Sequence, residues 1–239
     1  MIFKQKQTVL GFMCWKDTKL TPIGVFELVE DATINLFSKY NLDGVTLRQN
    51  YDAMWVIVKN RIKFFKEPKW GEEITIKSFV TEKSLVKICV DVCIENNKKE
   101  VLYYSKVEFC VLDIKSAKIK KLSSVGADVL KVEKPKYLMN FERFDEKKSE
   151  LFEKIKVKST NLDFSNHTNN VEYVRFLINS YSLEEIFDRK INEIEINYIS
   201  QSFEKDELLL YKTKEENKDY IFIKKGEQLV VKSEITFEK

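Results

Sequence analysis

Long segments with alternating apolar and polar residues set the strongest limit on how this chain can fold. Every second residue from Val86 to Ile94 is apolar, and the segment 101–113 is rich in β-branched and aromatic side chains. Both patterns are typical of β-strands. The short polar turn at residues 96–99 predicts that these two strands are antiparallel neighbours, and Glu73–Val80 is a further expected strand.

A helix is expected before these strands, from Pro22 to about Tyr40. Pro22 suits the first helical turn. One apolar stripe follows at helical spacing, formed by Val25, Leu28, Val29, Ala32 and Leu36. One long helix followed by antiparallel strands predicts an α+β unit.

The second half of the chain repeats this pattern. Val171, Val174, Ile178 and Tyr181 form a helical stripe, and strands are expected at Ile191–Gln201, Leu208–Lys214, Asp219–Lys225 and Gln228–Phe237, with a hairpin turn around Gly226. Trp70–Ile76 resembles Glu204–Leu210 at an offset of 204 − 70 = 134, and Asp17 matches Asp163 at 163 − 17 = 146. We interpret the chain as two copies of one unit, residues 1–120 and 159–239, joined by a connection at 121–158 with a short helix of its own.

Composition excludes several classes of protein. The 239 residues are 44% hydrophobic, which is enough for a core, and the net charge of +3 does not suggest nucleic-acid binding. Cys14, Cys89, Cys93 and Cys110 lack zinc-site spacing, so free thiols in a reducing cytoplasm are expected. No segment is long and apolar enough to span a membrane, and no sequence motif indicates a metal, nucleotide or other cofactor.

The densest polar cluster surrounds the single histidine, His167, where the second helix begins. Asp163 lies four residues before it, and Asn169 and Asn170 follow. A carboxylate there can activate water, an imidazole can exchange a proton near neutral pH, and helix N–H groups suit an oxyanion. The alternative is an ordinary helix cap with a packing histidine. Spacing by itself leaves both interpretations open.

The motif Asp-x-x-x-His-x-Asn-Asn-Val-x-Tyr at 163–173 resembles the second hotdog domain of the acyl-acyl carrier protein thioesterases. The resemblance extends to Arg61–Ile76 in the first half and Ile196–Gln201 in the second. It implies a tandem (double) hotdog fold and hydrolysis of fatty acyl thioesters in lipid metabolism. The partner that it implies is acyl carrier protein, an acidic protein, and Lys154, Lys156 and Lys158 could contact it or simply be solvated.

The resemblance also implies a catalytic set with two departures from the family pattern. Asp163 and His167 fall on its polar positions, Ser165 stands where Asn is common, and Gln201 aligns with the family's catalytic Glu. Gln cannot act as a base but can hold a water or a carbonyl. Asp163 is therefore expected to activate water, or to attack the thioester itself, with His167, Ser165 and Gln201 positioning the substrate. Amides near Asn169 and Asn170 would stabilise the oxyanion, and the neighbouring Ser202 has no matched base to make it a nucleophile.

The first half lacks this apparatus, because the 146 offset aligns His167 with Thr21. We expect it to bind the acyl chain, although plain core packing also accounts for its apolar candidates, which are Val25, Val29, Met54, Trp55 and Phe65. Two other functions remain open: an acyl-CoA thioesterase, and a non-catalytic relative that binds acyl groups or carrier protein. Both a monomer and a homodimer are compatible with two fused hotdog units.

Overall fold

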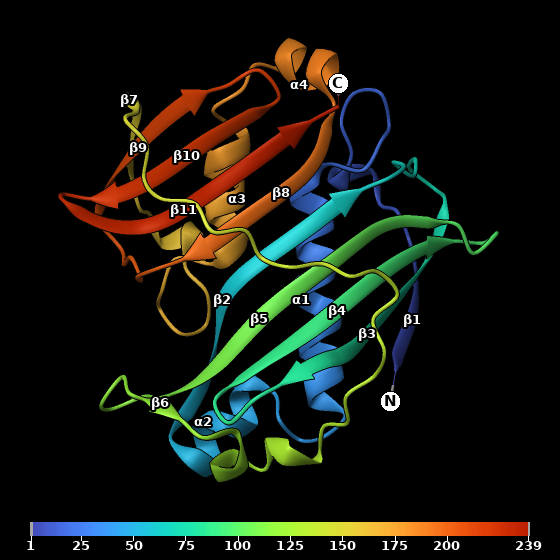
Figure 1. Ribbon diagram of the computed structural model, residues 1–239, viewed down its shortest axis with the longest axis vertical. Helices are drawn as coiled ribbons and strands as arrows, with labels where there is room; N and C mark the ends of the chain where they lie inside the picture. Colours follow the sequence, from blue (N-terminus) through green and yellow to red (C-terminus); the bar gives the residue numbers. More distant parts are fainter. Residues whose placement is uncertain (1, 239) are drawn as a thin grey trace. The chain divides into compact units, whose positions relative to one another are not determined.

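The computed structural model describes residues 2–238, and the chain divides into two compact units, Met1–Asn140 and Phe141–Lys239 (Figure 1). Each unit contains one antiparallel sheet and one main helix, which confirms the predicted tandem arrangement of α+β units. Among the described residues, no helix has the length and apolar character needed to cross a membrane.

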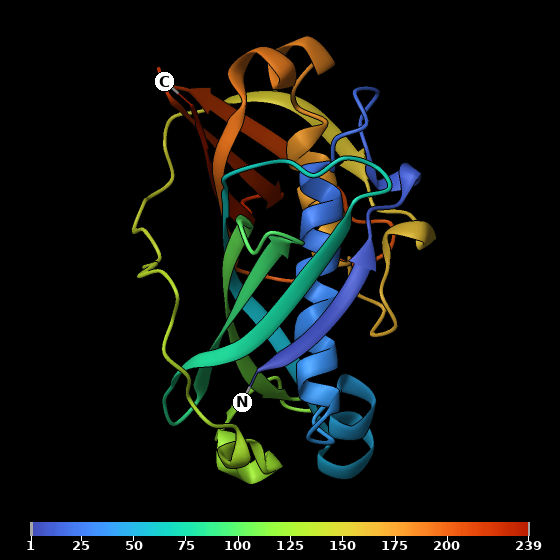
Figure 2. The same cartoon turned by 90° about the vertical axis from the view of Figure 1, so that its right-hand side faces the viewer.

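The first unit is built on a five-stranded sheet in the order β1-β3-β4-β5-β2, with the short β6 added beside β5. Its strands are β1 (Phe3–Thr8), β2 (Ala53–Phe64), β3 (Glu73–Lys83), β4 (Lys87–Asn96), β5 (Val101–Asp113) and β6 (Ile119–Lys120). Its helices are α1 (Pro22–Ser38) and α2 (Gly44–Tyr51), with short 3₁₀ turns at Gly11–Met13, Leu122–Val125 and Ala127–Val129. Figure 2 shows α1 lying along one face of this sheet.

The helix α1 confirms the predicted stripe. Thr21 precedes it, and the Thr21 hydroxyl accepts a hydrogen bond from the Gly24 amide at 3.0 Å. All five stripe residues are buried, because they face the sheet. The Ser78 hydroxyl on β3 donates to the Ala32 carbonyl at 2.7 Å, which ties the helix to the sheet.

The opposite face of this sheet is buried as well, although the alternating pattern puts polar residues there. Asp91 is only 1% exposed and accepts hydrogen bonds from the Tyr104 and Thr81 hydroxyls. Residues 131–140 cross this face (Figure 1). The Lys136 amide donates to the Tyr104 hydroxyl at 3.0 Å, and the Tyr137 ring packs edge-on against Tyr104. Burial raises the pKa of the Asp91 carboxyl.

The second unit has the strand order β8-β11-β10-β9-β7. Its strands are β7 (Glu150–Lys156), β8 (Ile191–Tyr198), β9 (Glu207–Lys214), β10 (Lys218–Lys225) and β11 (Gln228–Phe237), and its helices are α3 (Asn170–Ile178) and α4 (Leu183–Arg189), with a 3₁₀ turn at Ser159–Asn161. The four predicted strands and the Gly226 turn are confirmed. Two elements were not predicted: α4 and, in the expected connection, β7.

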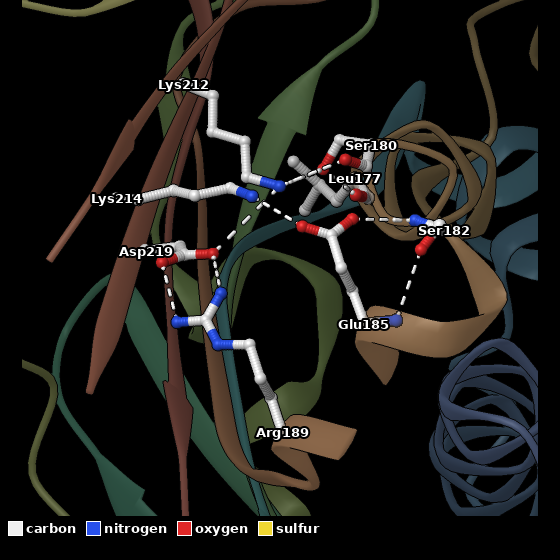
Figure 3. A network of polar contacts seen from close by, with 8 residues as sticks. All are labelled: Leu177, Ser180, Ser182, Glu185, Arg189, Lys212, Lys214 and Asp219. Atoms are coloured by element: carbon white, nitrogen blue, oxygen red, sulfur yellow. Dashed lines mark hydrogen bonds and ion pairs between the residues drawn. The ribbon is translucent and has the colours of Figure 1, made fainter. Parts of the chain in front are cut away.

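A buried charge cluster fixes α4 on the sheet of this unit (Figure 3). Asp219 on β10 is fully buried and accepts two hydrogen bonds from the Arg189 guanidinium, at 2.7 and 3.0 Å. The Lys212 ammonium lies 4.0 Å from the same carboxylate and donates to the Ser180 carbonyl at 3.0 Å. The cluster therefore joins the end of α4 and the segment after α3 to two neighbouring strands.

The two units share the same pattern of strand pairing, which agrees with the repeat expected from the sequence and corrects one offset. Thr8 pairs with Glu73 in the first unit, and Lys156 pairs with Glu207 in the second, giving offsets of 156 − 8 = 148 and 207 − 73 = 134. The strand orders β1-β3-β4-β5-β2 and β7-β9-β10-β11-β8 then correspond one to one.

The correct offset before the main helices is 148, not 146. The Asp163 amide donates to the His167 carbonyl, and the equivalent bond in the first unit runs from the Trp15 amide to the Lys19 carbonyl, both at 2.9 Å. His167 therefore corresponds to Lys19 rather than to Thr21, and the earlier match of Asp17 with Asp163 was out of register by two residues.

Candidate functional site

The loop before α3 is organised by Asp163. One oxygen of its carboxylate, Oδ1, accepts hydrogen bonds from the backbone amides of Ser165 at 2.7 Å and His167 at 3.3 Å. The loop turns at Asn166, which has a positive φ of 63°, a conformation that Asn tolerates well. Within residues 2–238, Oδ2 has no hydrogen-bond partner. The carboxylate is thus held by one oxygen while the other remains available.

His167 and Ser165 lie on the same loop, and each is half-buried. The His167 ring packs edge-on against Phe203, with 5.1 Å between ring centroids. Phe203 follows β8 in the loop 199–206, which also carries Gln201 and Ser202. The structure therefore brings the His167 loop and the Gln201 loop together, although the two segments are far apart in the sequence.

The backbone itself joins these two loops. The Thr168 amide donates to the Ser202 carbonyl at 2.9 Å. Gln201, the residue before Ser202, is exposed to solvent, whereas Ser202 is fully buried. Gln201 is thus attached to a fixed point beside the histidine loop while its own side chain is free to meet a ligand.

The first turn of α3 provides a candidate oxyanion donor. The Asn169 side chain caps the helix by accepting a hydrogen bond from the Val171 amide at 2.7 Å, and the Glu172 amide donates to the Asn169 carbonyl at 3.0 Å. The Asn170 amide is left without an acceptor in the described part of the chain. A helix N-terminus also carries a partial positive charge, so the Asn170 N–H suits a developing negative oxygen.

The sequence did not identify three buried hydroxyl groups beneath this site. The Ser202 hydroxyl lies 2.6 Å from that of Thr168 and 2.7 Å from that of Tyr173. Tyr173 is the last residue of the sequence motif, and Ser202 follows Gln201, so both adjoin residues that the sequence did single out. Their joint burial depends on the tertiary fold and has no signal in a single sequence.

The equivalent place in the first unit holds an ion cluster. The Lys19 ammonium lies 3.0 Å from Glu67 and 3.4 Å from Asp17. By the two offsets, Lys19 corresponds to His167 and Glu67 to Gln201 (201 − 67 = 134). The first unit therefore carries a different set of side chains at this position, one lysine paired with two carboxylates.

The apolar residues expected to bind an acyl chain occupy two faces of the first sheet. Val25 and Val29 on α1 are buried, and Trp55 on β2 stacks on Phe37 of α1 with 4.5 Å between ring centroids. Met54 is adjacent to Trp55 on a strand and so faces the other side. Phe65 is 43% exposed and stacks on Tyr137 of the covering segment. Val25, Val29 and Trp55 thus lie on the α1 side of this sheet, and Met54 and Phe65 lie on the opposite side.

The four cysteines all lie in the first unit, whereas the polar loop before α3 belongs to the second. Burial is the main cause that raises the pKa of both Cys89 and Cys93 to about 12, so these thiols stay protonated at neutral pH. Neither is the type of ionised thiol that acts as a nucleophile.

Two family models match the chain and together span most of it. Residues 13–131 match the acyl-ACP thioesterase N-terminal domain, and residues 144–239 match the acyl-ACP thioesterase C-terminal domain. No sequence among the curated proteins matches the chain.

Solved structures show the same fold over the whole chain. An acyl-ACP thioesterase from Bacteroides thetaiotaomicron superposes with a TM-score of 0.92 at 17% identity, covering 99% of this chain and 98% of that one. A 12:0-ACP thioesterase from Umbellularia californica superposes with a TM-score of 0.85 at 14% identity, covering 99% and 97%. The predicted double hotdog fold is thereby confirmed.

Proposed function

The chain belongs to the acyl-ACP thioesterase family, as a hydrolase of fatty acyl-ACP thioesters, and we propose that Asp163 and His167 form its catalytic core. The observation that carries this proposal is the geometry of the Asp163 carboxylate. Two loop amides hold Oδ1, while Oδ2 is unengaged beside the start of α3. A base whose orientation is fixed in advance loses little entropy when it meets a substrate.

In this mechanism Asp163 takes a proton from a water molecule that attacks the thioester carbonyl carbon. The carbonyl oxygen becomes an oxyanion and accepts a hydrogen bond from the Asn170 amide. The carbon–sulfur bond then breaks, and the pantetheine sulfur leaves as a thiol with the proton that Asp163 had accepted. The products are a free fatty acid and the free carrier thiol.

The remaining polar residues position the reactants. His167 polarises the thioester, and the Gln201 amide group holds the water or the carbonyl by hydrogen bonds. Ser165, whose amide is bonded to Asp163, contributes its hydroxyl at the same loop. Asn169 acts through the helix, since its side chain is committed to the cap.

In this proposal the first unit binds the acyl chain, and lysines of the second unit bind the carrier protein. Val25, Val29 and Trp55 contact the acyl chain along α1. Lys154 and Lys156 lie on β7, an exposed edge strand, and Lys158 follows it. Their positive charge suits an acidic carrier protein.

The test is release of free thiol from acyl-ACP by wild type, Asp163→Asn and His167→Ala. We expect each variant to lose at least about a hundredfold in kcat/KM, or about 2.7 kcal/mol of transition-state stabilisation. Asp17→Asn is the matched control, because Asp17 lies in the corresponding loop of the first unit, and it should retain the wild-type rate.

Two outcomes would contradict the proposal. Full activity in Asp163→Asn would remove the aspartate from the mechanism. A wild type that binds acyl-ACP without releasing thiol would make the protein an acyl-binding relative. Competition between acyl-ACP and acyl-CoA in the same assay identifies which carrier is preferred.

A further inference from the structure

Three hydroxyl groups meet in the interior of the second unit, directly below the loops that carry His167 and Gln201. The side chains of Thr168, Tyr173 and Ser202 are 5%, 3% and 0% exposed. The Ser202 hydroxyl is 2.6 Å from the Thr168 hydroxyl and 2.7 Å from the Tyr173 hydroxyl, and the Thr168 hydroxyl also donates to the Ser202 carbonyl at 3.2 Å.

With one choice of donors and acceptors, each of the three hydroxyl protons is used in a hydrogen bond. Tyr173 donates to the Ser202 hydroxyl, Ser202 donates to the Thr168 hydroxyl, and Thr168 donates to the Ser202 carbonyl. Burial raises the pKa of the Tyr173 phenol, so Tyr173 keeps its proton at neutral pH. Hydrogen bonds in such a chain polarise one another and strengthen. This series of hydrogen bonds links α3, the loop that carries His167 and the loop that carries Gln201.

The first unit shows that the fold does not require these hydroxyls. Applying the offsets of 148 and 134, the positions of Thr168, Tyr173 and Ser202 are occupied there by Leu20, Val25 and Pro68, all buried and apolar. The backbone bond is nevertheless the same, because the Leu20 amide donates to the Pro68 carbonyl at 3.0 Å. The same packing is thus achieved without any hydroxyl.

Burying three hydroxyl groups where apolar side chains suffice is unfavourable unless each finds a partner. The unit that contains the candidate catalytic residues is the one that has them. Ser202 also stands between Gln201 and Phe203, and the Phe203 ring packs on His167. Fixing Ser202 therefore fixes a neighbour of the histidine ring and the backbone that carries the glutamine.

We propose that Tyr173 and Ser202 are positioning residues, which hold the side chains of Gln201 and His167 in the relative positions that thioester hydrolysis requires. This inference rests on the proposed function. It assigns Ser202 a role through its hydrogen bonds rather than as a nucleophile. The hydroxyl chain acts as one unit, since each member depends on the next for its partner.

The kinetic test compares Tyr173→Phe, Ser202→Ala and the double variant in the thiol-release assay. We expect each single variant to lower kcat about ten- to a hundredfold while KM stays within about twofold, because misplaced groups slow the chemical step. The double variant should be no slower than the worse single variant. Tyr103→Phe is the matched control: Tyr103 is a buried tyrosine whose hydroxyl has no hydrogen-bond partner among the described residues.

A second readout does not depend on turnover. The chain has one histidine, so the imidazole signals in a proton NMR spectrum belong to His167. Tyr173→Phe and Ser202→Ala should shift or broaden them in the folded protein, and Tyr103→Phe should leave them in place. Unchanged His167 signals, unchanged kcat, or multiplicative losses in the double variant would overturn the proposal. If wild type is inert, the proposed function fails, and the NMR comparison still decides whether the hydroxyl chain positions His167.

Discussion

Lys19 and Glu67 form an ion pair of 3.0 Å at the positions that correspond to His167 and Gln201 in the other unit. The two copies have kept the same backbone hydrogen bonds around this place while their side chains have diverged. One copy has a histidine and a glutamine beside an aspartate. In the other copy, one lysine pairs with two carboxylates, Glu67 and Asp17, and no imidazole is present for acyl transfer.

This relationship predicts that the first copy is catalytically silent. Lys19→Met and Glu67→Gln should each leave kcat/KM for acyl-ACP within about twofold of wild type. Both side chains are more than one-third exposed, so the change in unfolding free energy should also stay below about 1 kcal/mol. Thiol-release kinetics and urea denaturation measure the two quantities. A tenfold loss of activity would show that the first copy takes part in catalysis.

Gln201→Ala should reduce kcat about tenfold. The amide group contributes a neutral hydrogen bond to the water or the carbonyl, and such a bond is worth about 0.5–1.5 kcal/mol. Because Gln201 is exposed, the fold should be unaffected, and thermal unfolding provides that check. Glu67→Gln is the control at the corresponding position. A variant as fast as wild type would exclude Gln201 from the site.

Lys212 should make stability depend on pH. Burial is the main cause that lowers the pKa of its ammonium from 10.5 to about 8, although Asp219 faces it and opposes the shift. The unfolded chain therefore binds more protons between pH 8 and 10.5, and the contribution of Lys212 to stability rises with pH in this range. Relative to Lys212→Met, wild type should gain about 1.5 kcal/mol in unfolding free energy from pH 8 to 9.5.

The comparison with Lys212→Met is needed because other groups titrate in the same interval. Cys89 and Cys93 have a raised pKa, so their contribution to stability falls as pH increases from 8 to 9.5. Both proteins share those groups, and the difference between them isolates Lys212. Lys214→Met serves as a matched exposed control. Parallel pH profiles for wild type and Lys212→Met would contradict the prediction.

Asp219→Asn should destabilise the second unit by about 3 kcal/mol or more, because it leaves the Arg189 guanidinium without its buried counter-charge. Glu238→Gln, which breaks an exposed pair with Lys190, should cost less than about 1 kcal/mol. Denaturant titration of both variants gives the comparison. Equal losses would mean that the buried cluster of Figure 3 contributes no more than a surface pair.

Sequence patterns predicted the strands that are rich in apolar and β-branched residues and largely buried. The strands Val101–Asp113 and Gln228–Phe237 match their predicted bounds, because apolar residues fill their inner positions. The strands β1 and β7 were missed, since both are exposed edge strands with few apolar residues. Their pairing with β3 and β9 is set by long-range contacts that leave no local pattern.

The candidate site was predictable to the extent that it is local. Asp163 and His167 lie within five residues of sequence, and their hydrogen bonds stay inside one loop. The hydroxyl chain of Ser202 and Tyr173 joins segments 29 residues apart, so it required the fold. The 146 offset was misjudged because Asp17 and Asp163 are identical residues, whereas backbone bonds place Asp163 opposite Trp15.

The segment 131–149 has a consequence for engineering the chain. Residues 131–140 cover the first sheet, and beyond Asn140 the chain does the same for the second, where Phe144 packs on Tyr220 and accepts a hydrogen bond from Lys232. Loop shortening, a common route to thermostable variants, would therefore strip one sheet of its cover. To express the two units separately, the chain should be divided between Asn140 and Phe141. Each fragment then keeps the segment that covers its own sheet.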